Sequence, residues 1–510
     1  MPAAALAPIR YLLRRAVIVQ RPADEPPTRM AWNGIEPLAV GAYLLLLVAA
    51  IVYSTSIRLY WFDEYFTMHL ARDPAALASH LMAGADQNPP LGYLLTSVCV
   101  AVFGEVEWAV RLPSLGGAVM AALGLYQFVR HRRGPWEAFL AMTVVFGSAP
   151  VWVYFLEARP YGLVIGCAAM ALALWQRRRP IAFGACLVVG LASHYYFAVP
   201  IAAFALAEAA VWYGERRIDR RFAIAFVASG ILLLAMQPFW GNTSKQYSAH
   251  FWSKAKFNAG AVENAYAELV RKDVTIPFAV ALIAGLVFAR RRELETYPLP
   301  ETIAVAALAA GPVLGVWLGA KVVGMYHFRY TLPAILGLAI AFAFAIGRMS
   351  GGHRGALALA AIVFASFGLI GNLRPARGHY AMEAKLFHET ADLLKRESTG
   401  TVLIEAPFEF VRLWHYRKEI PVESLADLNL ALAHTKSDTV DRGLLALAKV
   451  TPVPLTTPDA IADRLKAGEA IHYFGMRAGW HHVELERRGV QFESLATRFN
   501  GSLYRLTMKP

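Results

Sequence analysis

Charged residues are scarce in this chain of 510 residues: only 17% are Asp, Glu, Lys or Arg, whereas 57% are hydrophobic. A soluble globular chain usually has about 25% charged residues. The shortage excludes an ordinary soluble protein and indicates a chain that crosses a membrane several times. Cysteine is also scarce, because the only three residues are Cys99, Cys167 and Cys186, all in apolar segments. Their positions imply no disulfide framework and no thiol pair with the spacing of a metal site.

The net charge of +13 could indicate a partner such as nucleic acid, but its distribution argues against one. Residues 1–372 carry 31 Lys and Arg against 20 Asp and Glu, and residues 373–510 carry 19 against 17. The basic residues stand in short runs between apolar segments, which is typical of membrane topology signals. We therefore expect a membrane protein that binds no nucleic acid.

Eleven apolar segments approach the length of about 20 residues that a spanning helix needs. Two of them, between residues 180 and 213, are short and are divided only by Ser193-His194-Tyr195-Tyr196, so a hairpin and one long helix both stay open. The predicted spans are 36–57, 110–130, 136–156, 160–176, 180–193, 195–213, 222–240, 274–289, 301–319, 331–347 and 355–372.

The apolar run from Leu91 to Phe103 is too short to span comfortably, and we place it flat or re-entrant at the outer surface. With this choice the cytoplasmic segments hold 20 Lys and Arg and the outer loops 10, whereas a spanning run would give 13 inside and 17 outside. The positive-inside rule favours the first arrangement. It predicts a cytoplasmic N-terminal arm over residues 1–35, without a cleavable signal segment, and an outer location for residues 373–510.

Residues 373–510 have the composition of a soluble domain with mixed α/β structure. Thr401–Glu405 and Ala470–Phe474 are predicted strands, and Phe408–Lys418 is a predicted helix. No Gly-rich phosphate loop opens a helix in this domain, and the chain shows no internal repeat.

This topology brings nearly all the unusual polar residues to the outer surface. Each also has a simpler interpretation. Asp63-Glu64 could cap a helix, Arg159 could pair with Glu157 at the interface, and His194 could be an interior histidine. Arg329 is harder to explain in this way, because a permanent cation beside an apolar span is costly. The outer loops hold Asp63, Glu64, Arg72, Asp86 and Asn88-Pro89-Pro90-Leu91; Glu157-Ala158-Arg159-Pro160-Tyr161; His194-Tyr195-Tyr196; Lys245, His250, Lys254 and Lys256 among Tyr247, Phe251, Trp252 and Phe257; and Lys321 with Tyr326-His327-Phe328-Arg329-Tyr330.

Five of these features in order resemble the GT-C glycosyltransferases, a superfamily of polytopic helical membrane enzymes. They are the Asp-Glu pair after the first span, an acidic residue before Pro-Pro-Leu, Ala-Arg-Pro-Tyr, a His-Tyr hairpin, and Arg-Tyr opening a late span. The branch that the chain resembles holds protein O-mannosyltransferases and the lipid A aminoarabinose transferase. The resemblance covers residues 36–345 and implies a catalytic membrane domain over 36–372, followed by a periplasmic α/β domain over 373–510.

The resemblance implies transfer of a sugar, with inversion, from a polyprenyl-phosphate donor to a hydroxyl of a lipid, glycan or protein in the bacterial envelope. A carboxylate can take the acceptor proton. Because neighbouring helical residues point about 100° apart, Asp63 and Glu64 cannot both face the same atom. We assign Asp63 as the base and Glu64 to orientation or acceptor binding. The implied phosphate ligands are Arg329 and Arg159, with Lys321, His194 and His327 as further candidates; the implied substrate contacts are Asp86, Asn88, Pro89, Glu157, Tyr161, Tyr195 and Tyr330.

Two residues depart from the family pattern. Asn88 stands where many relatives have His, and it cannot titrate near neutrality. The chain also lacks the nearby Lys of the aminoarabinose transferases, and this departure counts against that activity. No carboxylate cluster calls for a divalent metal, and no cofactor is implied. The alternative function is a transporter or flippase of a lipid-linked substrate, which would place charged or broken-helix sites near the bilayer midplane.

Overall fold

The computed structural model describes residues 36–241, 250, 256–270, 275–289, 297–477, 479–498 and 500–509. The predicted N-terminal arm and the loop residues Lys245, Tyr247, Phe251, Trp252 and Lys254 lie outside these ranges.

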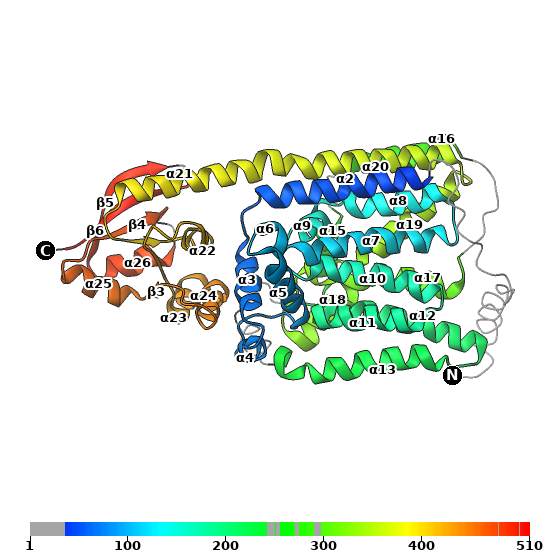
Figure 1. Ribbon diagram of the computed structural model, residues 1–510, viewed down its shortest axis with the longest axis horizontal. Helices are drawn as coiled ribbons and strands as arrows, with labels where there is room; N and C mark the ends of the chain where they lie inside the picture. Colours follow the sequence, from blue (N-terminus) through cyan, green and yellow to red (C-terminus); the bar gives the residue numbers. More distant parts are fainter. Residues whose placement is uncertain are drawn as a thin grey trace.

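The membrane part is a bundle whose long helices run side by side (Figure 1). Every predicted span corresponds to a helix or a bent pair of helices. Four described helices are long and apolar enough to cross a membrane, or six if each bent pair is one span, so the count of eleven stays a prediction. The helices are α2 (Glu36–Ile57), α7 (Leu112–Arg130), α8 (Pro135–Gly147) with α9 (Ala149–Phe155), α10 (Tyr161–Gln176), α11 (Pro180–Ser193), α12 (Ala198–Glu215), α13 (Arg220–Ala235), α16 (Thr275–Val287), α17 (Leu299–Ala309) with α18 (Gly311–Leu318), α19 (Ala334–Met349) and α20 (Arg354–Pro375).

Short breaks in these helices have local causes. Extended backbone at His194 (φ −157°, ψ 128°) ends α11, and the 3₁₀ turn η2 (Tyr195–Phe197) leads into α12, so the segment between 180 and 213 is two helices. Helices α8 and α9 bend by 78° around Ser148, and Pro150 lies in the first turn of α9, where its missing N–H costs nothing.

Helices α7 and α10 approach each other most closely through glycine. A Cβ on Gly117 would lie 2.2 Å from the carbonyl oxygen of Gly162, and one on Gly166 would lie 2.4 Å from the carbonyl oxygen of Gly117. Small residues let helix backbones pack closely where lipid gives no hydrophobic driving force. The glycines therefore let the backbones of α7 and α10 come into direct contact.

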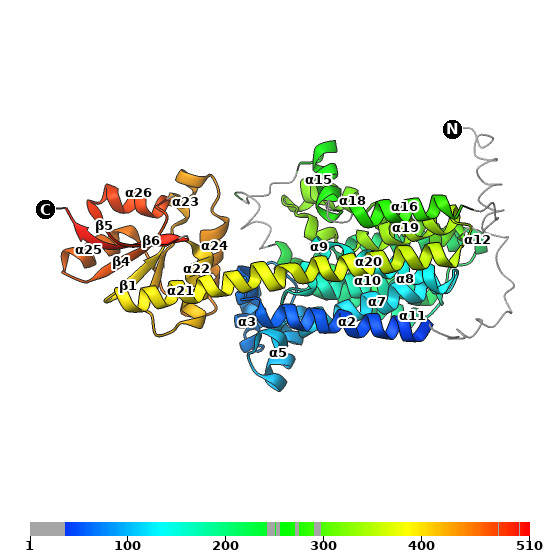
Figure 2. The same ribbon diagram turned by 90° about the horizontal axis from the view of Figure 1, so that it is seen from above.

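Four short helices lie at the end of the bundle that faces the C-terminal domain (Figures 1 and 2). They are α3 (Phe62–Arg72), α4 (Leu77–Met82), α5 (Leu91–Phe103) and α6 (Glu107–Val110). The apolar run Leu91–Phe103 is thus α5, one of the helices at this end, and its predicted place at the outer membrane surface stays a prediction. Helix α3 begins with the acidic pair, so its position decides where Asp63 lies.

One continuous helix of 44 residues, Arg354–Glu397, connects the bundle to the C-terminal domain. It consists of α20, the π-helical turn η6 (Ala376–Tyr380) and α21 (Ala381–Glu397). The predicted domain boundary at residue 373 falls inside this helix, which Figure 1 shows running the length of both parts.

The C-terminal domain has a six-stranded sheet of order β3-β2-β1-β4-β6-β5. The first four strands in this order are parallel, and β6 and β5 add an antiparallel edge. Strands β1 and β4 and helix α22 lie at the places predicted from the sequence. The elements are β1 (Thr401–Ile404), α22 (Pro407–Tyr416), β2 (Val422–Leu425), α23 (Leu428–Thr435), α24 (Thr439–Ala448), β3 (Leu455–Thr456), α25 (Pro458–Lys466), β4 (Ile471–Gly475), α26 (Trp480–Arg487), β5 (Val490–Arg498) and β6 (Gly501–Met508).

Candidate active site

The acidic pair at the start of α3 divides as helix geometry requires. Asp63 lines a cavity of about 220 Å³, whereas the side chain of Glu64 is completely buried in the protein. The two carboxylates therefore have different surroundings and can do different work.

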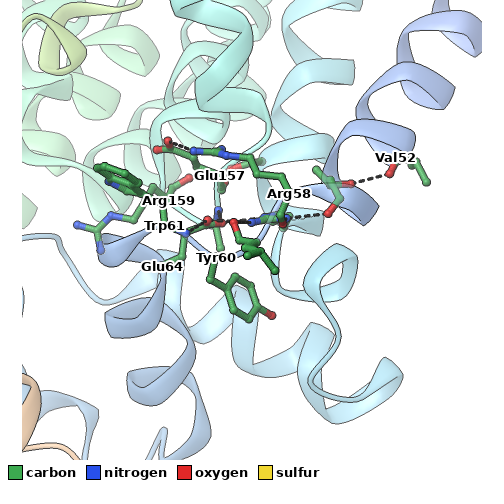
Figure 3. Close-up of polar contacts among 12 residues, drawn as sticks. Val52, Arg58, Tyr60, Trp61, Glu64, Glu157 and Arg159 are labelled. Atoms are coloured by element: carbon green, nitrogen blue, oxygen red, sulfur yellow. Dashed lines mark hydrogen bonds and ion pairs between the residues drawn. The ribbon is translucent and has the colours of Figure 1, made fainter. Parts of the chain in front are cut away.

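Glu64 is held by two elements outside α3. Its carboxylate accepts two hydrogen bonds from Arg111, at 2.8 Å from Nε and 2.9 Å from Nη2. It also accepts the backbone N–H groups of Trp61 (2.8 Å) and Ala158 (2.7 Å). Burial opposes its ionisation, but the charge and hydrogen bonds of Arg111 outweigh burial and lower the pKa of Glu64 below its ordinary value. Glu64 thus ties the start of α3 to α7 and to the loop before α10 (Figure 3).

Arg111 is the buried partner of Glu64, and the sequence analysis did not select it. It is 1% exposed, and its Nη1 donates to the carbonyl oxygens of Thr55 and Arg58, at 2.8 and 2.9 Å. The signal that could have found it is the one that singled out Arg329, a permanent cation at the beginning of an apolar span.

A second buried ion pair joins Arg58 and Glu157 (Figure 3), with Nη2 2.9 Å from Oε1. Burial raises the pKa of Glu157, and Arg58 only partly offsets this effect. The simpler interpretation of Arg159 as a partner of Glu157 is therefore wrong. The carboxylate of Glu157 pairs with Arg58, which the sequence analysis also missed.

Arg159 instead lies between Asp86 and the backbone of α3. Its guanidinium forms a two-pronged ion pair with the carboxylate of Asp86, and Nη1 also donates to the carbonyl oxygen of Asp63 at 3.1 Å. Burial opposes ionisation of Asp86, but the charge and hydrogen bonds of Arg159 outweigh it and lower the pKa of Asp86. Among the described residues, none bonds the buried Nε of Arg159.

Arg329 reaches the other side of Asp63 from the 3₁₀ turn η5 (Phe328–Thr331). Its Nη1 lies 3.1 Å from Oδ2 of Asp63, and the two side chains are 20% and 24% exposed. The guanidinium lies over the rings of Tyr161 and Tyr330, with centroids at 5.5 and 5.8 Å. The Nε of Arg329 likewise has no hydrogen-bond partner in the part of the chain that the structure describes. Both side chains of this pair line the cavity.

His194 contributes a neutral ring to the cavity wall. Its Nδ1 accepts the backbone N–H of Tyr196 at 3.2 Å, so the proton of the neutral ring stands on Nε2. Burial lowers the pKa of His194 to about 3, and the charges of Arg329 and Arg159 act in the same direction. At neutral pH His194 is therefore a hydrogen-bond donor and carries no charge.

The wall of the cavity contains both polar and apolar side chains. Nine of the residues predicted from the sequence line it: Asp63, Asp86, Asn88, Arg159, Tyr161, His194, Tyr195, Arg329 and Tyr330. Residues that the sequence analysis did not select complete the wall: Gln87, Tyr196, Ala198, Leu233, Trp240, Leu318, Val322, Val323 and Met325.

Five predicted site residues do not line this cavity. Glu64 and Glu157 are in the buried ion pairs described above, and Pro89 borders a separate small gap beside Arg159. Lys321 is exposed on the π-helical turn η4 (Gly319–Val323). His327 precedes η5, and its Nδ1 accepts the backbone N–H of Arg329 at 3.3 Å. Among the described residues, no three His, Cys, Asp or Glu side chains converge as metal ligands.

Residues 87–241 match the family described as dolichyl-phosphate-mannose-protein mannosyltransferase. No curated protein matches the chain significantly in sequence.

Three solved structures give further comparisons. The structure of ArnT from Cupriavidus metallidurans bound to undecaprenyl phosphate is similar with a TM-score of 0.57 at 14% identity, over 92% of this chain and 98% of that one. Its apo form gives 0.57 at 13%, with the same coverage. An oligosaccharyltransferase from Archaeoglobus fulgidus gives 0.42 at 11%, over 90% and 74%. The family match over residues 87–241 and the fold shared with ArnT support a GT-C superfamily glycosyltransferase.

Proposed function

We propose that this enzyme moves a sugar from a polyprenyl-phosphate donor to a hydroxyl group of an envelope lipid, glycan or protein, with inversion at the sugar carbon. The observation that carries the proposal is the meeting of Asp63 and Arg329 in one cavity, 3.1 Å apart. A base and a phosphate-binding cation are the two groups that this reaction needs close together. ArnT, which shares the fold, has been solved with undecaprenyl phosphate, a donor product of this class.

In the proposed reaction the acceptor oxygen attacks the anomeric carbon while its proton passes to the carboxylate of Asp63. The bond from that carbon to the phosphate oxygen breaks, and its electron pair leaves with the polyprenyl phosphate. Arg329 binds the phosphate through its planar guanidinium, which can contact two phosphate oxygens at once. Its interaction strengthens as negative charge develops on the leaving group.

The rest of the cavity binds the sugar and the lipid. Arg159 adds positive charge near the phosphate, and His194 offers its Nε2–H. Asp86, Asn88, Tyr195 and the tyrosine rings over which Arg329 lies surround the sugar. Leu233, Trp240, Leu318 and Val322 form the apolar part of the wall, which suits the first isoprene units of the donor. Glu64, Glu157 and Pro89 do not line the cavity; they hold the loops that carry these groups.

The reaction is proposed to take place on the periplasmic side of the bacterial inner membrane. The charge pattern supports a cytoplasmic N-terminus, with the active site and the C-terminal domain on the other side. A reporter enzyme that works only in the periplasm, fused after Pro510, should be active. Activity of a cytoplasmic reporter at the same position would reject this topology.

The central test is Asp63→Asn, assayed in membranes with a labelled polyprenyl-phosphate sugar. A general base typically contributes about 10²- to 10⁴-fold to the rate, and we expect a loss in that range. Asp73→Asn is the matched control, because Asp73 is exposed at the other end of α3 and bonds only the local backbone of Ala76. Transfer at the normal rate by Asp63→Asn would reject Asp63 as the base.

A further inference from the structure

Helix α22 of the C-terminal domain packs along the segment that carries the acidic pair. Phe408 lies against the rings of Trp61 and Phe62, with centroids at 5.0 and 5.1 Å. Further along the same helices, Trp414 stacks on His69 with centroids at 5.2 Å. Buried apolar side chains of α3 and of the C-terminal domain form one hydrophobic cluster. The two parts therefore share a core at this contact.

Helix α22 also bonds the backbone just before α3. The N–H of Tyr60 donates to the hydroxyl of Tyr416 at 3.2 Å, and Nε of Arg412 donates to the carbonyl oxygen of Tyr60 at 3.3 Å. Tyr60 is 1% exposed, so water cannot replace either partner. Arg412 is itself fixed by an ion pair with Glu383 of α21 at 2.6 Å. Both backbone polar groups of Tyr60 thus depend on the C-terminal domain.

The neighbouring backbone groups depend on the membrane part. The carbonyl oxygen of Leu59 accepts from Arg111 at 3.3 Å, and the N–H of Trp61 donates to Glu64. The C-terminal domain therefore supplies the hydrogen-bond partners of the Tyr60 backbone, while the membrane part supplies those of Leu59 and Trp61. Asp63 follows only three residues later, in the first turn of α3.

We propose that α22 positions Asp63, so that the C-terminal domain is part of the catalytic apparatus and not only a separate module for binding the acceptor. Tyr416 and Arg412 are the positioning residues, and they act through the backbone of Tyr60. The inference rests on the proposed function, since it assigns Asp63 a catalytic role. Small displacements of a reacting group reduce rates, and a 1 Å error can cost about 10²-fold.

The test is Tyr416→Phe, which removes the hydroxyl bonded to Tyr60 and keeps the ring, which stacks on Tyr60 and meets Phe387 edge to face. Rates are normalised to the number of donor-binding sites, so a smaller fraction of folded enzyme does not lower the reported rate. We expect kcat to fall about fivefold, while KM for the donor does not rise, because Arg329 stays in place and a displaced Asp63 competes less well for it. Tyr504→Phe is the matched control, since Tyr504 lies on β6 and contacts Tyr473 and Phe492, away from α3.

A second measurement is independent of the reaction. Amide hydrogen exchange of a peptide over residues 58–66 should be faster in Tyr416→Phe, whereas a peptide over residues 490–508 should be unchanged. Faster exchange with an unchanged kcat would overturn the inference, and so would unchanged exchange. A wild-type protein that transfers no sugar would instead reject the proposed function, so the two failures can be told apart.

Discussion

The guanidinium of Arg329 forms an ion pair with the carboxylate of Asp63, 3.1 Å away, although the two residues are 266 positions apart in the chain. In the proposed mechanism the donor phosphate therefore competes with Asp63 for Arg329. Phosphate binding would then take the cation away from the carboxylate and leave it free to accept a proton. The pair links occupation of the donor site to activation of the proposed base.

This competition predicts that Asp63→Asn binds undecaprenyl phosphate more tightly than the wild type while losing turnover. Loss of a partly exposed ion pair is worth up to about 1 kcal/mol, which is about a fivefold change in Kd. The affinity can be measured by titrating the purified protein in detergent, with Asp73→Asn as the control. Weaker binding by Asp63→Asn would show that the carboxylate supports the donor site instead of competing for it.

Arg329→Lys should keep a positive charge in the cavity but lose the planar fork. A hydrogen bond to a charged group is worth about 1.5–3 kcal/mol. We therefore expect KM for the donor to rise about tenfold or more in Arg329→Lys, and further in Arg329→Ala. Arg348→Lys is the control, since Arg348 is exposed in the last turn of α19. An unchanged KM in Arg329→Ala would remove this residue from the phosphate site.

Glu64→Gln should destabilise the fold, because it leaves Arg111 buried without its counter-charge. Breaking a buried ion pair by removing one partner costs about 3–5 kcal/mol. The matched control is Glu105→Gln, whose pair with Arg72 is more than one-third exposed and is worth about 0–1 kcal/mol. Thermal unfolding at pH 7 should separate the two variants clearly.

The same substitution has a defined pH dependence. The pKa of Glu64 in the folded protein lies below its ordinary value of 4.5. Its contribution to stability is therefore present above about pH 4.5 and is lost as the pH falls through the lowered folded-state pKa. The difference in melting temperature between wild type and Glu64→Gln should shrink on acidification below that point. A constant difference would show that ionisation of Glu64 does not support the fold.

Two adjacent glycines give a matched test of the α7–α10 contact. A Cβ at Gly117 would lie 2.2 Å from the carbonyl oxygen of Gly162, whereas nothing lies within 4 Å of one at Gly116. Gly117→Ala should cost about 1–3 kcal/mol as overpacking. Gly116→Ala should be neutral or stabilise by up to about 1 kcal/mol, because alanine favours the helix. Equal melting temperatures for the two variants would contradict the close approach of these helices.

The sequence by itself determined the class of the protein and the residues that meet at the site. Apolar length and charge distribution depend on how each segment partitions between water and lipid, so they can be read without knowing the packing. They placed Asp63, Arg159, His194 and Arg329 on one face, and the structure brings all four to one cavity. The order of local motifs was enough to identify the superfamily.

Only the tertiary structure decided how these residues are paired. Glu64 and Arg111 are 47 positions apart, and Arg58 and Glu157 are 99 apart, so no local pattern connects them. Whether an arginine binds a ligand or a buried carboxylate depends on which helices come into contact, and that is set by shape at positions such as Gly117. The contact of α22 with Tyr60 has the same origin, because it forms only when both domains are folded.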